Sequence, residues 1–230
     1  MLNGKIVLIT GAKGGLGSFV TDAFLNAGAV VVGTSRSIAR SDFAHPNFHA
    51  EPAELDDGAK ARALISRVVS QLQRVDALVH LVGGFAGGKT VDDTDDATLD
   101  HMLDMNLRSF FHIARAVLPV MRIQASGSVL AIGSRTAMEP AETLGAYTAS
   151  KAALVALVRT IALENKQTGI SANVILPGTM DTPANRLAMP TANFSQWVNP
   201  GQVASLLVHL ASDAAKQVTG AVIPIYGGEL

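Results

Sequence analysis

The chain has 230 residues, of which 48% are hydrophobic and 16% charged. This composition excludes an intrinsically disordered protein and predicts a single domain over residues 1–230. The formal net charge is −1 and no basic block is present, which argues against a nucleic-acid-binding surface. The absence of cysteine excludes disulfides, thiolate zinc sites and cysteine nucleophiles, and is compatible with a reducing compartment.

The amino-terminal segment reads as a strand rather than a signal peptide, because its short apolar run, Ile6 to Thr10, is followed by glycines. No apolar run approaches the roughly 18 residues that are needed to span a bilayer. We therefore expect a cytoplasmic protein that acts on a small molecule and engages neither membrane nor nucleic acid.

Short β-branched runs alternate with helical stretches along the chain. The predicted strands are 5–10, 29–33, 77–82, 128–133, 171–176 and 221–225, and the predicted helices lie near 17–27, 55–73, 95–122, 147–166 and 200–212. Strands that are apolar almost throughout fit a parallel sheet covered on both faces. The alternation predicts an α/β fold with a doubly wound sheet. Pro224 removes a backbone donor from the last strand and places that strand at an edge.

Two predicted helices, near 95–122 and 147–166, are apolar around most of their circumference. One interpretation is that both are buried within the domain. The other is that they form a subunit interface, which gives a homodimer or homotetramer.

A glycine-rich turn connects the first strand to the first helix, with the sequence Thr10-Gly11-Ala12-Lys13-Gly14-Gly15-Leu16-Gly17. Its glycines permit a tight turn and a close approach of the backbone to phosphate. The N-terminus of the helix then presents free N–H groups to a pyrophosphate. The motif predicts a dinucleotide site; an ordinary strand-to-helix turn is the alternative.

The second strand leads into Ser35 and Arg36, where NAD-selective sites carry an acidic residue. A guanidinium suits a 2′-phosphate through paired charge-assisted hydrogen bonds. We therefore predict NADP(H) rather than NAD(H). The alternative is that Arg36 is a solvated loop arginine.

Tyr147 and Lys151 are four residues apart and fall on one face of a predicted helix. A nearby ammonium lowers the pKa of a phenol, and the tyrosine would then donate a proton to a carbonyl oxygen. Ser134 follows the predicted strand 128–133, at the sheet edge where ligands bind, and is placed to hydrogen-bond a substrate oxygen. Asn106, in the preceding helix, is a candidate for holding a water that links Lys151 to solvent.

These segments, in this order, resemble the short-chain dehydrogenase/reductase family over the whole chain. The matching elements are TGAKGGLG at 10–17, Asn106, Ser134, YTASK at 147–151, LPGTMDTP at 176–183 and YGG at 226–228. The resemblance implies a seven-stranded Rossmann sheet, Tyr147 as proton donor, Lys151 on the nicotinamide ribose, Ser134 polarising the substrate and Asn106 in a proton relay. It also implies that Pro177, Gly178, Thr179 and Thr182 contact the nicotinamide end.

The sequence departs from the family at two places. The usual Asn-Asn-Ala-Gly becomes His80-Leu81-Val82-Gly83, and we expect the backbone of Val82 and Gly83 to pass beside the adenosine while His80 is a packed structural histidine, neither acid nor ligand. The adenine-contacting Asp after the third strand is missing, and Glu51 is the candidate to replace it.

Two loops are similar to dihydropteridine reductase, a branch of the same family. They are Gly83–Gly88 and the segment from Leu176 through Trp197. Phe85, Met189 and Trp197 are the candidate substrate contacts, with Phe85 or Trp197 stacking on a flat ring. Alternatively Met189, Phe194 and Trp197 only pin loop 183–199 to the body. Ser134 and the Ser35-Arg36 pair differ from that branch, so we expect a general carbonyl reductase first and a pterin reductase second.

Other functions are less well supported by the sequence. The acidic run 92–96 lies where a helix begins and fits a helix cap with favourable dipole interactions, so we predict no metal site. A nucleotide-sensing scaffold is the non-enzymatic alternative, but such a protein would be expected to lose part of the set of Asn106, Ser134, Tyr147 and Lys151.

Overall fold

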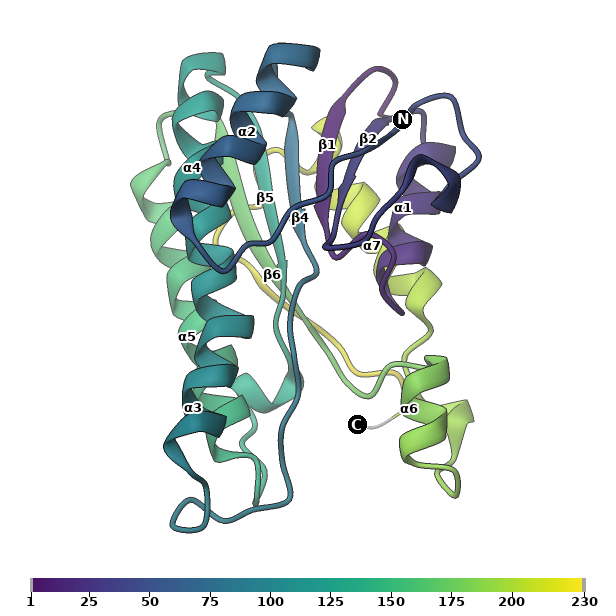
Figure 1. The fold of residues 1–230 in the computed structure, drawn as a ribbon, viewed down its shortest axis with the longest axis vertical. Coiled ribbons are helices and arrows are strands. Elements are labelled where there is room, and N and C mark those ends of the chain that lie inside the picture. The colour runs from purple at the N-terminus through teal and green to yellow at the C-terminus, as the bar shows by residue number, and fades with distance from the viewer. Residues whose placement is uncertain (1, 229–230) are drawn as a thin grey trace.

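The computed structural model describes residues 2–228 and has a single sheet of seven parallel strands at its centre (Figure 1). Their spatial order is β3 (Phe48–Ala50), β2 (Val30–Thr34), β1 (Ile6–Thr10), β4 (Ala77–His80), β5 (Gly127–Ile132), β6 (Ile170–Pro177) and β7 (Val222–Ile225). The chain runs outward in one direction from β1 to β3 and in the other from β4 to β7. This confirms the predicted doubly wound Rossmann fold.

Helices cover both faces of the sheet (Figure 1). One face carries α1 (Gly17–Asn26) and α7 (Pro200–Leu210), and the other carries α2 (Gly58–Leu72), α4 (Ser109–Gln124) and α5 (Gly145–Glu164). Two further helices, α3 (Asp96–Leu103) and α6 (Pro183–Ala188), lie beyond the end of the sheet at the bottom of the view.

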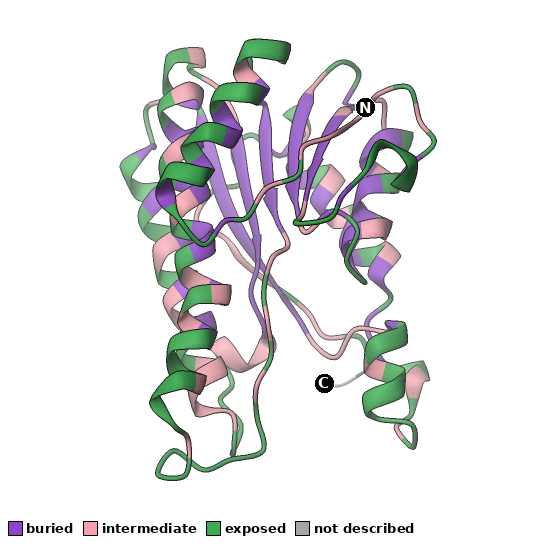
Figure 2. Cartoon of the chain, viewed as in Figure 1, coloured by how far each residue is buried: buried purple, intermediate pink, exposed green. Residues whose placement is uncertain are grey.

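The apolar strands are explained by burial on both sides (Figure 2). Along β1, Leu8 packs into the core beneath α2, α4 and α5, while Val7 and Ile9 pack into the core beneath α1 and α7. Successive strand residues point to opposite faces, so a continuous apolar run is needed when both faces are covered. The strands are therefore buried, whereas much of α3 and α6 is exposed (Figure 2).

Several short elements were not predicted from the sequence pattern. β3 has only three residues, too few for a periodicity to be recognised. The segment 183–199, expected as a loop, contains α6 and a 3-10 turn over Phe194–Gln196. The start of α6 has local signals, because Thr182 caps it through the N–H of Asn185 and Pro183 occupies its first turn.

The helix predicted over 95–122 is continuous in the structure, but its hydrogen-bonding pattern changes in the middle. Its middle, Asp104–Arg108, is a π-helical turn between α3 and α4. Such turns are rare and occur frequently at functional sites. Asn106 lies at its centre and is fully buried.

The two apolar helices are only partly buried. Phe111 and Ile123 on α4 have 43% and 89% of their surface exposed, and Leu163 on α5 has 61%. By length and mean hydropathy α5 is also able to cross a membrane, so the expectation that no segment approaches that length is wrong for this helix. The core helices of soluble proteins can have the same length and mean hydropathy. Helix α5 packs on β6, and 44% of its most apolar 18-residue stretch is buried.

Candidate active site

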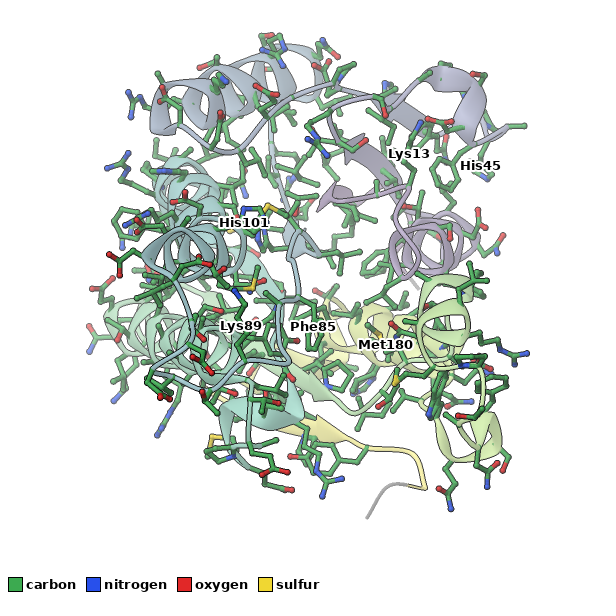
Figure 3. All side chains as sticks on the ribbon, turned by 60° about the horizontal axis from the view of Figure 1, so that its bottom comes forward. Lys13, His45, Phe85, Lys89, His101 and Met180 are labelled. Atoms are coloured by element: carbon green, nitrogen blue, oxygen red, sulfur yellow. The ribbon has the colours of Figure 1, made fainter. Side chains whose placement is uncertain are left out.

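The segments that carry the predicted site residues meet at the carboxyl edge of the sheet. Because all strand pairs are parallel, the turn after β1 and the loops after β4, β5 and β6 emerge at the same edge. Figure 3 brings this edge forward and shows Phe85 on the side of α3 and α5 and Met180 on the side of α6. The predicted sequence motifs are therefore neighbours in space.

Ser134 and Tyr147 are brought together at the ends of β5 and the start of α5. Ser134 is buried in extended conformation, and its hydroxyl accepts a hydrogen bond from the Thr136 N–H at 3.3 Å. Burial raises the pKa of Tyr147, while hydrogen bonding to the Ser134 side chain acts in the opposite direction. Tyr147 therefore stays protonated at neutral pH, as a proton donor requires.

Lys151 lies one turn along α5 and is buried. Its Nζ donates to the carbonyl of Ile132 at 2.9 Å and is 6.0 Å from the centre of the Tyr147 ring. Burial lowers the pKa of Lys151 to about 8. The expected lowering of the Tyr147 pKa by this ammonium is not observed, because burial of the phenol dominates and Lys151 is not among the causes of its shift.

Asn106 joins three segments of the site. Its Oδ1 accepts from the Gly84 N–H at 2.9 Å, and its Nδ2 donates to the Gly84 carbonyl at 3.1 Å and to Ser150 Oγ at 3.0 Å. Ser150 in turn donates to the carbonyl of Tyr147 at 2.7 Å. The amide thus fixes the loop after β4 to the start of α5, and the water-holding role predicted for it stays a prediction.

The glycine turn after β1 is too tight for larger side chains. Gly11 has a φ of +71°, and a Cβ on Gly17 would lie 2.0 Å from the Gly11 carbonyl oxygen. Lys13, Gly14, Gly15 and Leu16 complete the turn, and α1 starts without a side-chain cap. The Ser18 N–H in its first turn donates to the Gly14 carbonyl at 3.0 Å, and the positive end of the helix dipole faces the turn, where it favours an anion.

The end of β2 carries the predicted selectivity residues. The hydroxyls of Thr34 and Ser35 are buried without a hydrogen-bond partner among the described residues. Arg36 is exposed just beyond, and Lys13 reaches the same loop, donating to the Ser37 carbonyl at 2.8 Å and to Asp42 at 3.0 Å. The structure therefore gathers two cations, the Asp42 carboxylate and two unpartnered hydroxyls at this end of the site.

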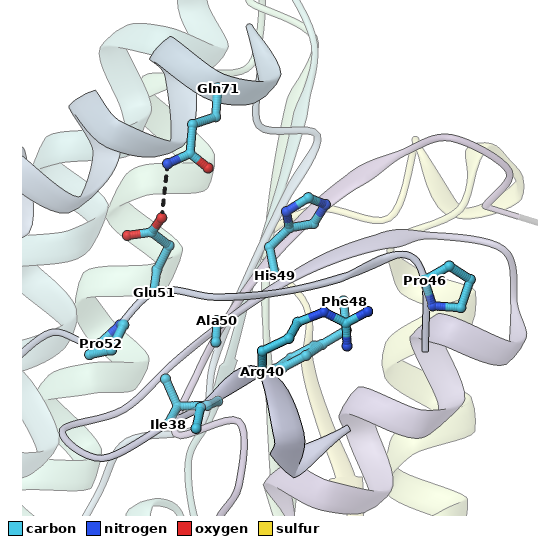
Figure 4. A pocket seen from close by; sticks show the side chains of 10 residues that line it. Ile38, Arg40, Pro46, Phe48, His49, Ala50, Glu51, Pro52 and Gln71 are labelled. Atoms are coloured by element: carbon cyan, nitrogen blue, oxygen red, sulfur yellow. Dashed lines mark hydrogen bonds between the residues drawn. The ribbon is translucent and has the colours of Figure 1, made fainter. Parts of the chain in front are cut away.

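Glu51 does not stand free beside the adenosine region. Its carboxylate pairs with Arg67 at 2.9 Å. It also accepts a hydrogen bond from Gln71 at 3.1 Å (Figure 4), and both partners lie on α2. These contacts occupy both carboxylate oxygens. The contact of Glu51 with adenine stays a prediction.

The loop after β6 turns back toward the glycine turn. Pro177 ends the strand, Gly178 donates to the Ile225 carbonyl at 3.0 Å, and Thr179 accepts from Val198 at 2.8 Å. A Cβ on Gly15 would lie 3.5 Å from Thr182, so Thr182 and the turn are adjacent. The predicted nicotinamide contacts therefore lie between the glycine turn and the ends of β6 and β7; these are Pro177, Gly178, Thr179 and Thr182.

The aromatic residues of segment 183–199 are packed against one another. The rings of Phe194 and Trp197 are 4.7 Å apart, and the Arg186 guanidinium lies 4.7 Å over Phe194. Trp197 is only 9% exposed, whereas Met189 is 41% exposed. The geometry favours the pinning interpretation for Trp197 over stacking on a substrate.

Comparisons with known proteins agree with this arrangement. The sequence profile of the family described as short chain dehydrogenase matches residues 5–192. The chain belongs to the short-chain dehydrogenase/reductase family. It is therefore an oxidoreductase, and the family uses a nicotinamide nucleotide as cofactor.

Relatives within the short-chain dehydrogenase/reductase family have varied names. The chain is 30% identical to dehydrogenase/reductase SDR family member 6 of Rattus norvegicus, covering 99% of this chain and 98% of that one. It is also 30% identical to a 3-oxoacyl-(acyl-carrier-protein) reductase of Thermotoga maritima, with the same coverages. A crystal structure titled gox2181 superimposes with a TM-score of 0.91 at 27% identity, covering 99% and 96% of the two chains.

The residues present fit the family's cofactor. A Cβ on Gly83 would lie 2.8 Å from Asn106 Oδ1 and 3.2 Å from Lys151 Nζ, so only glycine lets the backbone pass there. The glycine turn, the unpartnered Ser35 hydroxyl and Arg36 are suited to the adenosine and phosphate end. Lys151 and the loop from Pro177 to Thr182 would hold the nicotinamide end. Residues 2–228 contain no group of three or more residues suited to a metal ion.

His80, the main departure from the family pattern, lies in a chain of buried hydrogen bonds. The Leu81 N–H donates to Thr10 Oγ1 at 3.2 Å, which lies 2.9 Å from His80 Nδ1. On the other side His80 Nε2 lies 3.3 Å from Ser109 Oγ, which donates to the Met105 carbonyl at 2.7 Å. All four bonds are satisfied when Nε2 carries the ring proton. His80 thus connects β1 and β4 to the π-helical turn, as a packed structural histidine.

Acid should destabilise the protein through His80. Burial, aided by the charge of Lys151, lowers the pKa of His80 from 6.5 to about 3. Between these values the unfolded chain binds more protons, so stability is full above pH 6.5 and falls by up to about 1.4 kcal/mol per pH unit below it. In His80→Gln, the free energy of unfolding measured in urea should fall less between pH 7 and pH 4 than it does in the wild-type protein. A His101→Gln variant, which changes an exposed histidine on α3, should keep the wild-type slope; equal slopes in all three proteins would contradict this assignment.

Two features of the site were not predicted. The π-helical turn has no recognisable sequence signal, although the buried asparagine at its centre was identified. Ser150, which links Asn106 to Tyr147, lies within the YTASK motif and was overlooked because it faces Asn106 rather than the open edge of the site.

Proposed function

We propose that this short-chain dehydrogenase/reductase transfers hydride between NADPH and a small carbonyl or alcohol substrate. The observation that carries this proposal is the meeting of Ser134, Tyr147 and Lys151 with the Asn106-anchored loop at the carboxyl edge of the sheet. When bound, the cofactor supplies the hydride.

The roles of the chain's own residues follow from their surroundings. Tyr147, protonated at neutral pH, donates a proton to the substrate oxygen, and Ser134 hydrogen-bonds the same oxygen. Buried Lys151, with a pKa of about 8, is still largely protonated at pH 7 and places a positive charge near the phenol.

The preference for NADPH rests on the end of β2. Arg36 is exposed and pairs with no carboxylate among the described residues, so its guanidinium is available for a 2′-phosphate. Arg40, in contrast, is committed to the carbonyls of Phe43 and His45. Of the two arginines in this loop, Arg36 is therefore the selectivity residue.

The direct experiment is to follow NADPH oxidation by the purified protein with a panel of ketones, 3-ketoacyl esters and quinonoid dihydropterin. We expect turnover mainly with ketones or keto esters. Turnover mainly with the pterin would replace this proposal by a dihydropteridine reductase activity. Failure to oxidise NADPH with any carbonyl, despite tight binding of the nucleotide, would favour a nucleotide-sensing scaffold instead.

The same family membership supports a homodimer or homotetramer formed through α4 and α5. A groove of about 330 Å³ runs between these helices, lined by apolar side chains such as Phe111, Leu118 and Leu157. With the exposed Ile123 and Leu163, it forms an apolar face of the kind found at subunit interfaces.

Leu163→Glu should therefore shift the protein toward the monomer mass in sedimentation velocity, because a charge would be buried at the interface. Phe19→Glu, at a similarly exposed apolar residue on α1, should leave the mass unchanged. A single wild-type species at the monomer mass would exclude this interface.

A further inference from the structure

An exposed aromatic ring stands directly beside the predicted proton donor. The ring of Phe85 has its centre 5.0 Å from that of Tyr147, at 67° to it, in an edge-to-face contact. Phe85 nevertheless has 68% of its surface exposed. A substrate whose carbonyl oxygen is hydrogen-bonded to the Tyr147 hydroxyl would place its substituents next to the Phe85 ring.

The loop that carries Phe85 is fixed at both ends. Gly84 makes its two hydrogen bonds to Asn106, and the Gly88 N–H donates to the Thr143 carbonyl at 2.9 Å. Thr143 is β-branched yet has a φ of +60°, a costly conformation that persists where the surrounding structure enforces it. The loop that carries Phe85 is therefore already ordered, so that binding of a ligand against the ring costs little conformational entropy.

The surroundings of Phe85 are apolar. A Cβ on Gly87 would lie 2.3 Å from the Leu144 side chain and 3.2 Å from the Phe85 ring, so loop and helix start are in close contact. A Cβ on Gly145 would lie 3.0 Å from Val91, which is 79% exposed. Phe85, Leu144 and Val91 therefore form an apolar wall beside Tyr147.

Apart from the buried Lys151, whose Nζ donates to the Ile132 carbonyl, three cations of the segments around this wall are paired with carboxylates. Lys89 pairs with Asp95 at 3.3 Å, and Arg135, beside Ser134, pairs with Glu139 at 2.7 Å. Across the site, Arg186 donates to Asp181 at 2.8 Å. A substrate carboxylate or phosphate would have to compete with these pairs, and would lose its hydration on the apolar wall.

We propose that the substrate is an uncharged carbonyl compound with a planar ring attached next to the carbonyl, and that Phe85 is the residue that selects the ring. This rests on the proposed carbonyl reduction. It narrows the reaction to neutral aryl or cyclic carbonyl compounds, in contrast to acyl thioesters on phosphorylated carriers or sugar acids. Phe85 would cover the ring while Ser134 and Tyr147 hold the oxygen.

Three α-keto probes separate the effect of the ring from the effect of charge. Ethyl phenylglyoxylate is neutral with a ring, ethyl pyruvate is neutral without one, and phenylglyoxylate has the ring and a negative charge. With NADPH, we expect kcat/KM for ethyl phenylglyoxylate to exceed each of the other two by about tenfold or more, the scale that a missing apolar contact or an unmatched polar group produces.

Two variants assign the preference to Phe85. Phe85→Ala should lower kcat/KM for ethyl phenylglyoxylate by about tenfold and leave ethyl pyruvate within about twofold, because only the ring contact is lost. Val218→Ala, which shortens an exposed apolar side chain just before β7, at the edge of the sheet opposite the site, should leave all three values unchanged. Thermal unfolding of both variants checks that the fold is retained.

The outcomes separate this inference from the proposed function. Equal or better turnover of ethyl pyruvate or phenylglyoxylate, or a ring preference that survives in Phe85→Ala, would overturn the inference and leave carbonyl reduction standing. Absence of turnover with all three probes would overturn the inference, and absence of turnover with the whole ketone and keto-ester panel would overturn the proposed function as well.

Discussion

Tyr147→Phe should lower kcat for carbonyl reduction by about 10²–10⁴-fold, the range that a positioned general acid contributes. The variant removes the phenol hydroxyl that hydrogen-bonds to the Ser134 side chain at the end of β5, while the ring and its contact with Phe85 stay. NADPH affinity, measured by quenching or enhancement of nucleotide fluorescence, should change little.

The chain offers a matched control in its second tyrosine. Tyr226 packs under the Arg135 guanidinium at 4.8 Å and lies outside the hydrogen-bonded site. Tyr226→Phe should keep turnover near the wild-type value. Undiminished turnover in Tyr147→Phe, or an equal loss in both variants, would refute Tyr147 as the acid.

Arg36→Asp should reverse the choice between nucleotides. A hydrogen bond to a charged group contributes about 1.5–3 kcal/mol. Since about 1.4 kcal/mol is tenfold, kcat/KM with NADPH should fall by roughly ten- to a hundredfold or more. NADH should gain, because a carboxylate at this position accepts from ribose hydroxyls. Steady-state kinetics with both nucleotides at a fixed ketone concentration measures the ratio.

Arg62→Asp is the control for charge alone, since Arg62 is an exposed arginine on α2. It makes the same change in net charge but is not on the loop after β2, and the NADPH/NADH ratio should stay at its wild-type value. If Arg36→Asp and Arg62→Asp give the same ratio, the selectivity does not reside at the end of β2. Lys13, which reaches the same loop, would then be the next residue to exchange.

The fold was largely predictable because its strands are buried on both faces. Runs such as Ile6 to Thr10 and Ser171 to Leu176 leave no alternative to a covered parallel sheet, and the observed strands end within two residues of the predicted limits in these cases. The three residues of β3 and the six of α6 were missed, because segments this short are set by tertiary contacts and caps rather than by periodicity.

The site was predictable where parallel topology decides position. Ser134, Tyr147 and the glycine turn had to meet at the carboxyl edge once the strand order was known. Details that depend on side-chain partners were not predictable. Glu51 is tied to Arg67, the Tyr147 pKa is raised rather than lowered, and Trp197 is packed on Phe194, and none of these follows from spacing along the chain.

Both edges of the sheet resist extension by another strand. On one side β3 offers only three residues, and on the other Pro224 interrupts the row of donors along β7. A strand from a second molecule would gain few backbone hydrogen bonds at either place, so this sheet is protected from edge-to-edge polymerisation. Self-association of the protein is therefore expected to use its helical faces, where the shape of the contact allows a closed oligomer to form instead of an open polymer.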